Sequence, residues 1–530
     1  MASLIGVIAA IVACLFLVLP WCPLGVPSEW AWTRHAIPSD LMELADRLFM
    51  PVLSGAVFFS VARAGERRIV RAQKLSEAGL LLVLVLTGLF WFRNVQQAAP
   101  SPHREVKQLW VNYDRYASGY FLEAAFKIPS AEVLLTGYEA RMREGDVLHV
   151  GTHPPGLFLL SLATLHLTKT SPGLVRVLEA IRSKERESLF RQLELSTHFE
   201  RPLTAQELAA LQLLALLSLL APPLTLLPLY FLTRTLSDRR TAWQVACLFL
   251  TVPTIAVFCP KSDVIYPLTM TTFLWLGTAA VLTERLIPQL LWSAAAALSL
   301  SGCLLLSLAH LPAVVVLVGF VFLRNLNRSR RDWIVSFRGG LLLLSFLLVI
   351  IFVSSLLTKC NFFVVWKLNL TNHSHFYDQS TRTWWIWLLV NIVELAFAVG
   401  LPLFLTAAAG SIAVVRNVGY MISRLRQPPE TSAAFIAACL LTGLVLWISG
   451  KNSGEAARLW CFLTPWLAIA TIGWFRGAAT QNANSVEGAR SLQAALGARD
   501  DSSTGWSRLL LLQLVMAVIT VGTVNGYMSI

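Results

Sequence analysis

The sequence predicts an all-α protein, a polytopic transmembrane helical bundle of about 13 spans. Hydrophobic residues make up 56% of the 530 positions and charged residues only 14%, whereas about a quarter of the residues in a soluble protein are charged. Apolar runs of roughly twenty residues recur along the chain, and a helix needs this length to cross a bilayer. Tryptophans such as Trp91, Trp110 and Trp460 stand beside expected helix ends, as in the interfacial aromatic belts of membrane proteins.

The predicted spans are the apolar runs between polar, arginine-rich segments. The first run has no basic segment before it and no convincing cleavage site after it, so we expect a retained span and not a signal peptide. The run that contains Gly400 and Pro402 is long, and a kink is expected there. The spans are expected at residues 2–20, 47–63, 77–93, 207–233, 241–258, 264–283, 288–308, 310–323, 339–357, 388–415, 431–449, 459–475 and 507–526.

Arginine-rich loops predict the orientation of the bundle. Four basic clusters fall on the same side in this arrangement, and the positive-inside rule makes that side cytoplasmic. The first residue is then cytoplasmic and the last one is outside. The clusters are Arg63, Arg67, Arg68, Arg71 and Lys74; Arg234, Arg239 and Arg240; Arg324, Arg328, Arg330 and Arg331; and Arg416, Arg424 and Arg426.

Residues 94–206 are predicted to form one large region on the outer side. The apolar run 155–167 inside it is short for a span, so we expect a juxtamembrane or re-entrant helix there. The basic residues of 168–206 favour a cytoplasmic position. That position would move the arginine-rich loops 238–240 and 327–331 to the outside, and regions this long largely escape the charge rule.

The formal net charge of +13 does not indicate a nucleic-acid-binding protein. No zinc-ligand spacing, RNA-binding signature or basic helix with interleaved aromatics accompanies it. Anionic lipid headgroups or a phosphorylated substrate could use the basic residues that are not needed for orientation. The eight cysteines have no C-x-x-C spacing, so neither a metal knuckle nor a redox motif is indicated.

Polar chemistry is concentrated in four segments of the outer side. Lipid cannot hydrogen-bond a stray histidine or an irregular backbone, so such segments are expected to line a water-accessible cavity. In the first segment the acidic and aromatic residues have helix-compatible spacing. The segments are 111–120 (VNYDRYASGY) with the following Glu123, 149–156 (HVGTHPPG), 259–263 (CPKSD) and 450–460 (GKNSGEAARLW).

In this order, the segments resemble the GT-C integral-membrane glycosyltransferases. The most similar branch contains the protein O-mannosyltransferases and aminoarabinose transferases. The shared features are an acidic-aromatic first outer loop closed by His-Pro-Pro, a span ending in Pro and an outer Asp, and an Arg-to-Pro pattern before a late span. The residues that carry the resemblance are Asp114, His153, Pro154, Pro155, Pro260, Asp263, Arg458 and Pro465.

The resemblance covers roughly residues 80–475 and implies a GT-C-like fold in three parts. Residues 1–76 form two extra N-terminal spans, which depart from the family. Residues 77–475 form the transmembrane core, with juxtamembrane helices in its outer loop 94–206. Residues 476–530 form a polar cytoplasmic loop and the last span. A second departure is the lack of an Asp-Glu pair in the first outer loop, where only Asp114 takes that place.

The resemblance implies an inverting enzyme of the cell envelope. It would transfer a hexosyl or pentosyl group from a polyprenyl-phosphate donor to a glycan, lipid or protein acceptor. The reaction would occur on the extracytoplasmic face of a bacterial inner membrane or a plasma membrane. A carboxylate would take the proton of the acceptor hydroxyl as general base, and the candidates, in order of preference, are Asp114, Asp263 and Glu123.

The leaving group of that reaction is a lipid phosphate, which arginine binds through paired donors and lysine as a point charge. Arg458, Lys451 and Lys261 are the candidates for this role. His149 and His153 are candidates for hydrogen bonds to the phosphate or the sugar. No metal-ligand cluster has convincing spacing, although outer carboxylates could gather around Mg²⁺ in the fold.

Other interpretations remain open at this stage. Asp114 could pair with Arg115 on an exposed helix, and interfacial Lys and Arg often anchor lipid headgroups. A transporter or flippase of lipid-linked intermediates would also use a basic outer cavity, but it should show ionisable residues deep in its spans and internal repeats. Glu394 is the clearest such residue, and no repeat is visible. A structural membrane protein without catalysis is the third interpretation.

Overall fold

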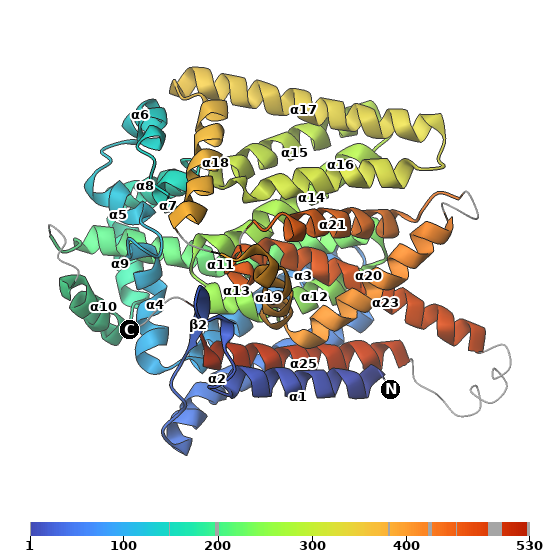
Figure 1. The fold of residues 1–530 in the computed structure, drawn as a ribbon, viewed down its shortest axis with the longest axis horizontal. Coiled ribbons are helices and arrows are strands. Elements are labelled where there is room, and N and C mark those ends of the chain that lie inside the picture. Colours follow the sequence, from blue (N-terminus) through green and yellow to red (C-terminus); the bar gives the residue numbers. More distant parts are fainter. Residues whose placement is uncertain are drawn as a thin grey trace.

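The protein is a multi-pass helical membrane protein. The computed structural model describes residues 2–147, 149–196, 201–379, 382–421, 427–451, 453–485 and 501–526. Within these ranges, ten helices are long and apolar enough to cross a membrane. Three shorter apolar helices, at 7–18, 384–399 and 461–475, accompany them. Figure 1 shows long helices running side by side, with a group of shorter helices at one end of the bundle.

The long helices and their short connecting elements form the bundle. They are α1 (Ala2–Val18), α2 (Leu41–Ile69), α3 (Lys74–Val95), α11 (Ala205–Leu236), α12 (Arg239–Phe249), α13 (Pro253–Phe258), the 3₁₀ turn η2 (Ser262–Ile265), α14 (Tyr266–Leu282), α15 (Leu286–Leu306), α16 (Leu311–Asn325), α17 (Arg330–Thr358), α18 (Phe362–Gln379), α19 (Trp384–Val399), α20 (Leu401–Tyr420), α21 (Thr431–Ile448), α22 (Ala456–Leu459), α23 (Thr464–Ser485) and α25 (Asp501–Thr523).

Residues 94–206 form the group of shorter helices. It contains α4 (Ser101–Tyr113), α5 (Tyr120–Phe126), α6 (Ala131–Arg143), α7 (His149–Thr152), α8 (Gly156–Thr170), α9 (Pro172–Ile181) and α10 (Lys184–Ser196). Helix α8, which covers the apolar run 155–167, has 15 residues and is not among the helices long enough to cross a membrane.

Two predicted spans are interrupted. The expected span 241–258 was wrong as a single helix: α12 ends at Phe249, and α13 begins at Pro253, because proline has no N–H to continue the helical hydrogen bonds and restricts the residue before it. The expected kink in span 388–415 is a complete break, since Gly400 has φ +92° between α19 and α20.

Ion pairs bring the first two basic clusters together. The buried carboxylate of Glu77 in α3 pairs with Arg234 and with Arg239, the latter at 3.2 Å. Glu66 in α2 pairs with Arg240 at 3.0 Å. These pairs join the first two clusters and fasten α2 and α3 to the ends of α11 and α12. Arg424 and Arg426 of the fourth cluster, and residues 486–500 of the predicted cytoplasmic loop, lie outside the described residues.

A small antiparallel sheet joins the two ends of the chain. Strand β1 (Leu24–Val26) pairs with β2 (Trp30–Arg34), and β2 pairs with β3 (Val524–Asn525). Between β1 and β2, the carboxylate of Glu29 accepts hydrogen bonds from the Thr383 backbone N–H at 2.8 Å and the Trp387 indole at 2.7 Å. The hairpin is therefore fastened both to α25 and to the start of α19.

The end of the His-Pro-Pro-Gly motif is a point of close packing. A Cβ on Gly156 would lie 2.4 Å from the carbonyl oxygen of Leu305 at the end of α15. This is closer than any tolerated contact, and the obstacle is backbone. Glycine at this position therefore allows α8 to start directly against α15.

We predict that Gly156→Ala destabilises the protein by about 1–3 kcal/mol, because the new methyl group overpacks this contact. The matched control is Gly137→Ala in α6, where a Cβ meets nothing within 4 Å and alanine favours the helix. Thermal unfolding in detergent should show a lower midpoint for Gly156→Ala alone. Equal midpoints for the two variants would contradict the packing argument.

The orientation is tested by cysteine labelling in intact cells with a membrane-impermeant maleimide. Glu185 in α10 and Arg330 at the start of α17 are both exposed. We expect Glu185→Cys to react from outside and Arg330→Cys to react only after the membrane is opened. The reverse pattern would overturn the proposed topology.

Candidate functional site

Three of the four predicted segments meet around Lys261. Only 3% of this residue is exposed, and Asp263, two positions later, is 5% exposed. The pKa of Lys261 is lowered to about 7, first by burial and then by the charge of Arg458, while Asp263, Glu455 and Asp114 act in the opposite direction. These groups come from three distant parts of the chain and lie within electrostatic range of one buried cation.

Arg458 lies in the short helix α22 and is also buried. Its guanidinium pairs with Glu455 at 2.5 Å, and 7% of the residue is exposed. The preceding residue fixes the turn: the Ala457 N–H donates to Glu394 of α19 at 3.1 Å, and the Ala457 carbonyl accepts from the Thr254 hydroxyl of α13. Helices α13 and α19 thus hold the backbone that carries Arg458.

A further contact joins this turn to Asp263. The thiol of Cys461 donates to the Asp263 backbone carbonyl at 2.9 Å. Asp263 itself lies in η2, the 3₁₀ turn that leads into α14. Segment 259–263 therefore contacts the residue that directly follows segment 450–460, and Arg458 and Glu455 of that segment act on Lys261.

Asp114 lies in a turn and not inside a helix. Helix α4 ends at Tyr113, and α5 begins at Tyr120 after Gly119, which has φ +79°. The Asp114 carboxylate accepts a hydrogen bond from the Ala117 N–H at 2.8 Å through Oδ2. The helix-compatible spacing of 111–120 was therefore misleading. The turn leaves this carboxylate partly exposed beside the buried lysine.

Tyr120 connects the His-Pro-Pro segment to the same group. Its ring lies 5.8 Å from that of His153, and burial raises its pKa well above the ordinary value, with Asp263 adding to the rise and Arg458 opposing it. The phenol therefore stays a neutral hydrogen-bond donor. The sequence offers no sign of this role, because a tyrosine between two helices is more often a packing residue.

Helix α18 holds the His153 backbone in place. The His153 carbonyl accepts from the Tyr138 hydroxyl at 2.8 Å and from the Asn369 side-chain amide at 3.1 Å. The Asn372 amide donates to the Gly151 carbonyl at 2.9 Å. Both asparagines begin Asn-x-Ser/Thr patterns, but their side chains are buried, so neither amide is exposed for glycosylation.

Glu123 and Lys451 are not among the groups that act on Lys261. Glu123 pairs with Arg141 at 2.6 Å and Lys127 at 2.9 Å; burial alone would raise its pKa, but hydrogen bonds from these two residues hold it below the ordinary value. Lys451 is exposed in the loop after α21. The His149 side chain lies outside the described residues.

Among the residues that the structure describes, no group of three or more His, Cys, Asp or Glu side chains is arranged to hold a metal ion. A role for Mg²⁺ therefore stays a prediction. The chemistry that these residues offer on their own is clear. Lys261 and Arg458 can hold an anion, a carboxylate beside them can accept a proton, and the Tyr120 hydroxyl can donate a hydrogen bond.

Sequence comparison finds no matching protein family and no matching curated protein. Among solved structures, the chain is similar to the oligosaccharyltransferase of Archaeoglobus fulgidus, which was determined in complex with Zn and sulfate. The TM-score is 0.41 and the sequence identity is 15%, over 62% of this chain and 43% of that one. This chain thus matches less than half the length of that protein. A likeness of this degree assigns no residue and no activity to this chain.

Proposed function

We propose that the protein is a membrane glycosyltransferase that uses a polyprenyl-phosphate-linked sugar as donor. The acceptor would be a glycan, a lipid or a protein on the extracytoplasmic face. The observation that carries this proposal is the group formed by Lys261, Arg458, Asp263 and Asp114. Two buried cations beside carboxylates, at the end of the bundle opposite the arginine ion pairs, suit a reaction in which a phosphate leaves.

The cations have a role in stabilising that leaving group. As the bond between the anomeric carbon and the phosphate oxygen breaks, its electron pair stays with the phosphate, which gains negative charge. Arg458 can give the phosphate two parallel N–H donors, and Lys261 a point charge. Because both side chains are almost fully buried, their attraction for an anion is stronger than it would be in water.

Asp114 is the preferred general base. The acceptor oxygen attacks the anomeric carbon from the face opposite the phosphate, and its proton passes to a carboxylate. Asp114 is partly exposed, and the Ala117 N–H donates to its Oδ2. That hydrogen bond therefore does not prevent Oδ1 from accepting the proton. Asp263 is nearly fully buried beside Lys261 and is better suited to orient Lys261 and the sugar.

Glu394 is the residue that, from the sequence, best fits a transporter, because it is ionisable and lies deep in a predicted span. In the structure it supports a turn. One of its carboxylate oxygens accepts both the Trp32 indole N–H at 2.6 Å and the Ala457 N–H at 3.1 Å. It therefore supports the Arg458 turn. This contact favours the enzyme over the transporter interpretation.

We predict that Asp114→Asn lowers sugar transfer by about 10²–10⁴-fold, the usual contribution of a general base, and that Asp263→Asn is similarly impaired. The measurement is mass spectrometry of polyprenyl-phosphate sugars, which should accumulate in cells that lack the protein. Glu132→Gln, on an exposed position of α6, should clear the accumulated donor. Normal clearance by Asp114→Asn would remove the base assignment.

The catalytic efficiency of the enzyme with its lipid-phosphate donor should change with pH. Since the pKa of Lys261 is lowered to about 7, the ammonium loses its proton as the pH rises through that value. We expect kcat/KM for the donor to fall above pH 7, with a limiting slope of about tenfold per pH unit. Lys261→Arg should abolish this fall because arginine stays charged. A profile that is flat for the wild type would contradict the phosphate role of Lys261.

A further inference from the structure

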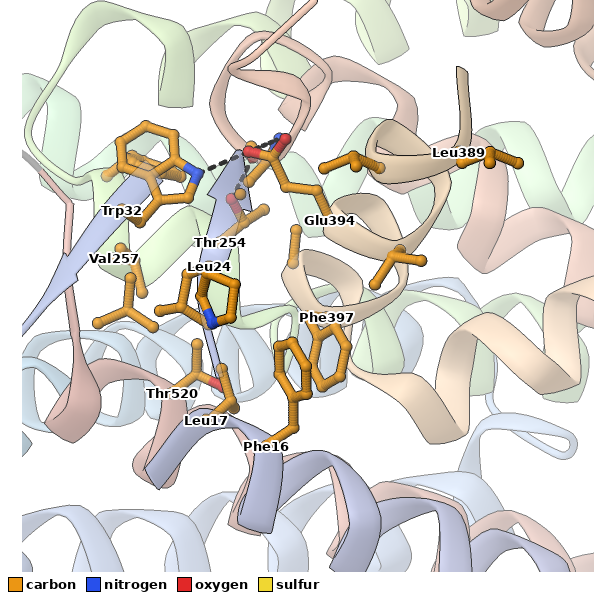
Figure 2. A pocket seen from close by; sticks show the side chains of 18 residues that line it. Phe16, Leu17, Leu24, Trp32, Thr254, Val257, Leu389, Glu394, Phe397 and Thr520 are labelled. Carbon is orange, nitrogen blue, oxygen red and sulfur yellow. Dashed lines mark hydrogen bonds between the residues drawn. The ribbon is translucent and has the colours of Figure 1, made fainter. Parts of the chain in front are cut away.

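An apolar cavity of about 270 Å³ lies next to the Arg458 turn. Its walls come from α1, the β1 strand, α13, α19 and the end of α25. Figure 2 shows Trp32, Thr254 and Glu394 gathered at one end of the cavity, and Phe16 and Phe397 at the other. Apart from the polar end, the side chains that line it are almost all aliphatic or aromatic, so its ligand should be a hydrocarbon.

Two residues that line the cavity are close in sequence to the buried cations Lys261 and Arg458, which do not line it themselves. Phe258 at the end of α13 lines the cavity, and Lys261 follows three residues later. Ala457 of α22 also lines it, and its neighbour is Arg458. A molecule whose phosphate contacts both cations would therefore have apolar surface within a few residues of that phosphate.

The cavity also borders the lipid-facing surface. Leu389 and Val393 of α19 line it and are 68% and 49% exposed. At the far end, the rings of Phe16 in α1 and Phe397 in α19 stack with centroids 4.6 Å apart. A chain from the surrounding lipid could enter past Leu389 and Val393, and the two phenylalanines limit how far it extends.

We propose that this cavity binds the first part of the isoprenoid chain of the lipid-phosphate donor, with the phosphate held by Lys261 and Arg458. The inference rests on the proposed function for the identity of the phosphate. It adds a role for segments outside the GT-C-like core, since α1, the hairpin and α25 supply much of the wall. Trp32 and Glu394 then serve two purposes, because they close the polar end of the cavity and hold the Arg458 turn.

The experiment measures Kd by native mass spectrometry, with the purified full-length protein in detergent. The probes are a long-chain polyisoprenyl monophosphate, the corresponding phosphate-free polyisoprenol, and phosphatidylglycerol. Val393→Trp should fill the mouth of the cavity without overpacking the core, and Leu389→Trp is the second such variant. Val415→Trp is the control, because Val415 on α20 is equally lipid-facing (56% exposed) and does not line the cavity.

We expect both cavity variants to raise Kd for the monophosphate and the polyisoprenol by about tenfold, equivalent to 1.4 kcal/mol, and the control to leave both unchanged. Arg458→Ala should weaken binding of the monophosphate only.

If the cavity variants bind normally while Arg458→Ala loses affinity, the chain-binding inference is wrong and the proposed function stands. If Arg458→Ala has no effect while the cavity variants do, the cavity is supported and the phosphate role fails. Equal binding of phosphatidylglycerol would reduce the cavity to a general lipid site and overturn the inference.

Discussion

The burial of Lys261 is the constraint around which this end of the molecule is built. An ammonium group that is 3% exposed is costly unless opposite charges surround it. No single helix supplies them. Asp263 comes from the same turn, Glu455 from the segment before α22, and Asp114 from the turn between α4 and α5. The short elements α13, η2 and α22, which interrupt an otherwise regular bundle, bring these groups to one place.

The same balance of charge limits how the site can bind an anion. Three carboxylates accompany the two cations, so the site has no strong positive field that would attract any phosphate from a distance. Arg458 already pairs with Glu455 at 2.5 Å. A phosphate must therefore be held by direct contacts at short range, and an apolar chain anchored in the adjacent cavity would add affinity that the charges alone do not provide.

The sequence predicted the elements that follow from composition and missed those that depend on distant partners. Apolar run length predicted most of the spans. Gly400 and Pro402 predicted a kink in 388–415, where the structure has a complete break. Pro253 also marked a break, but the continuous apolar run concealed it. Helix α18 was missed because its mixture of aromatic and polar residues has no clear period. That Glu123 would pair with Arg141, and that Tyr120 would contact His153, depends on how α5, α6 and α8 pack, which spacing along the chain does not reveal.

The pairing of β2 with β3 bears on the order in which the protein can be completed. β2 lies near the start of the chain and β3 near its end, so this sheet forms only after α25 has been synthesised and inserted. Until then α1 lacks its principal neighbour, and the wall that α25 contributes to the cavity is missing. The apolar cavity is thus completed late, and in a chain that ends before residue 501 the side of the cavity that α25 closes is open to lipid.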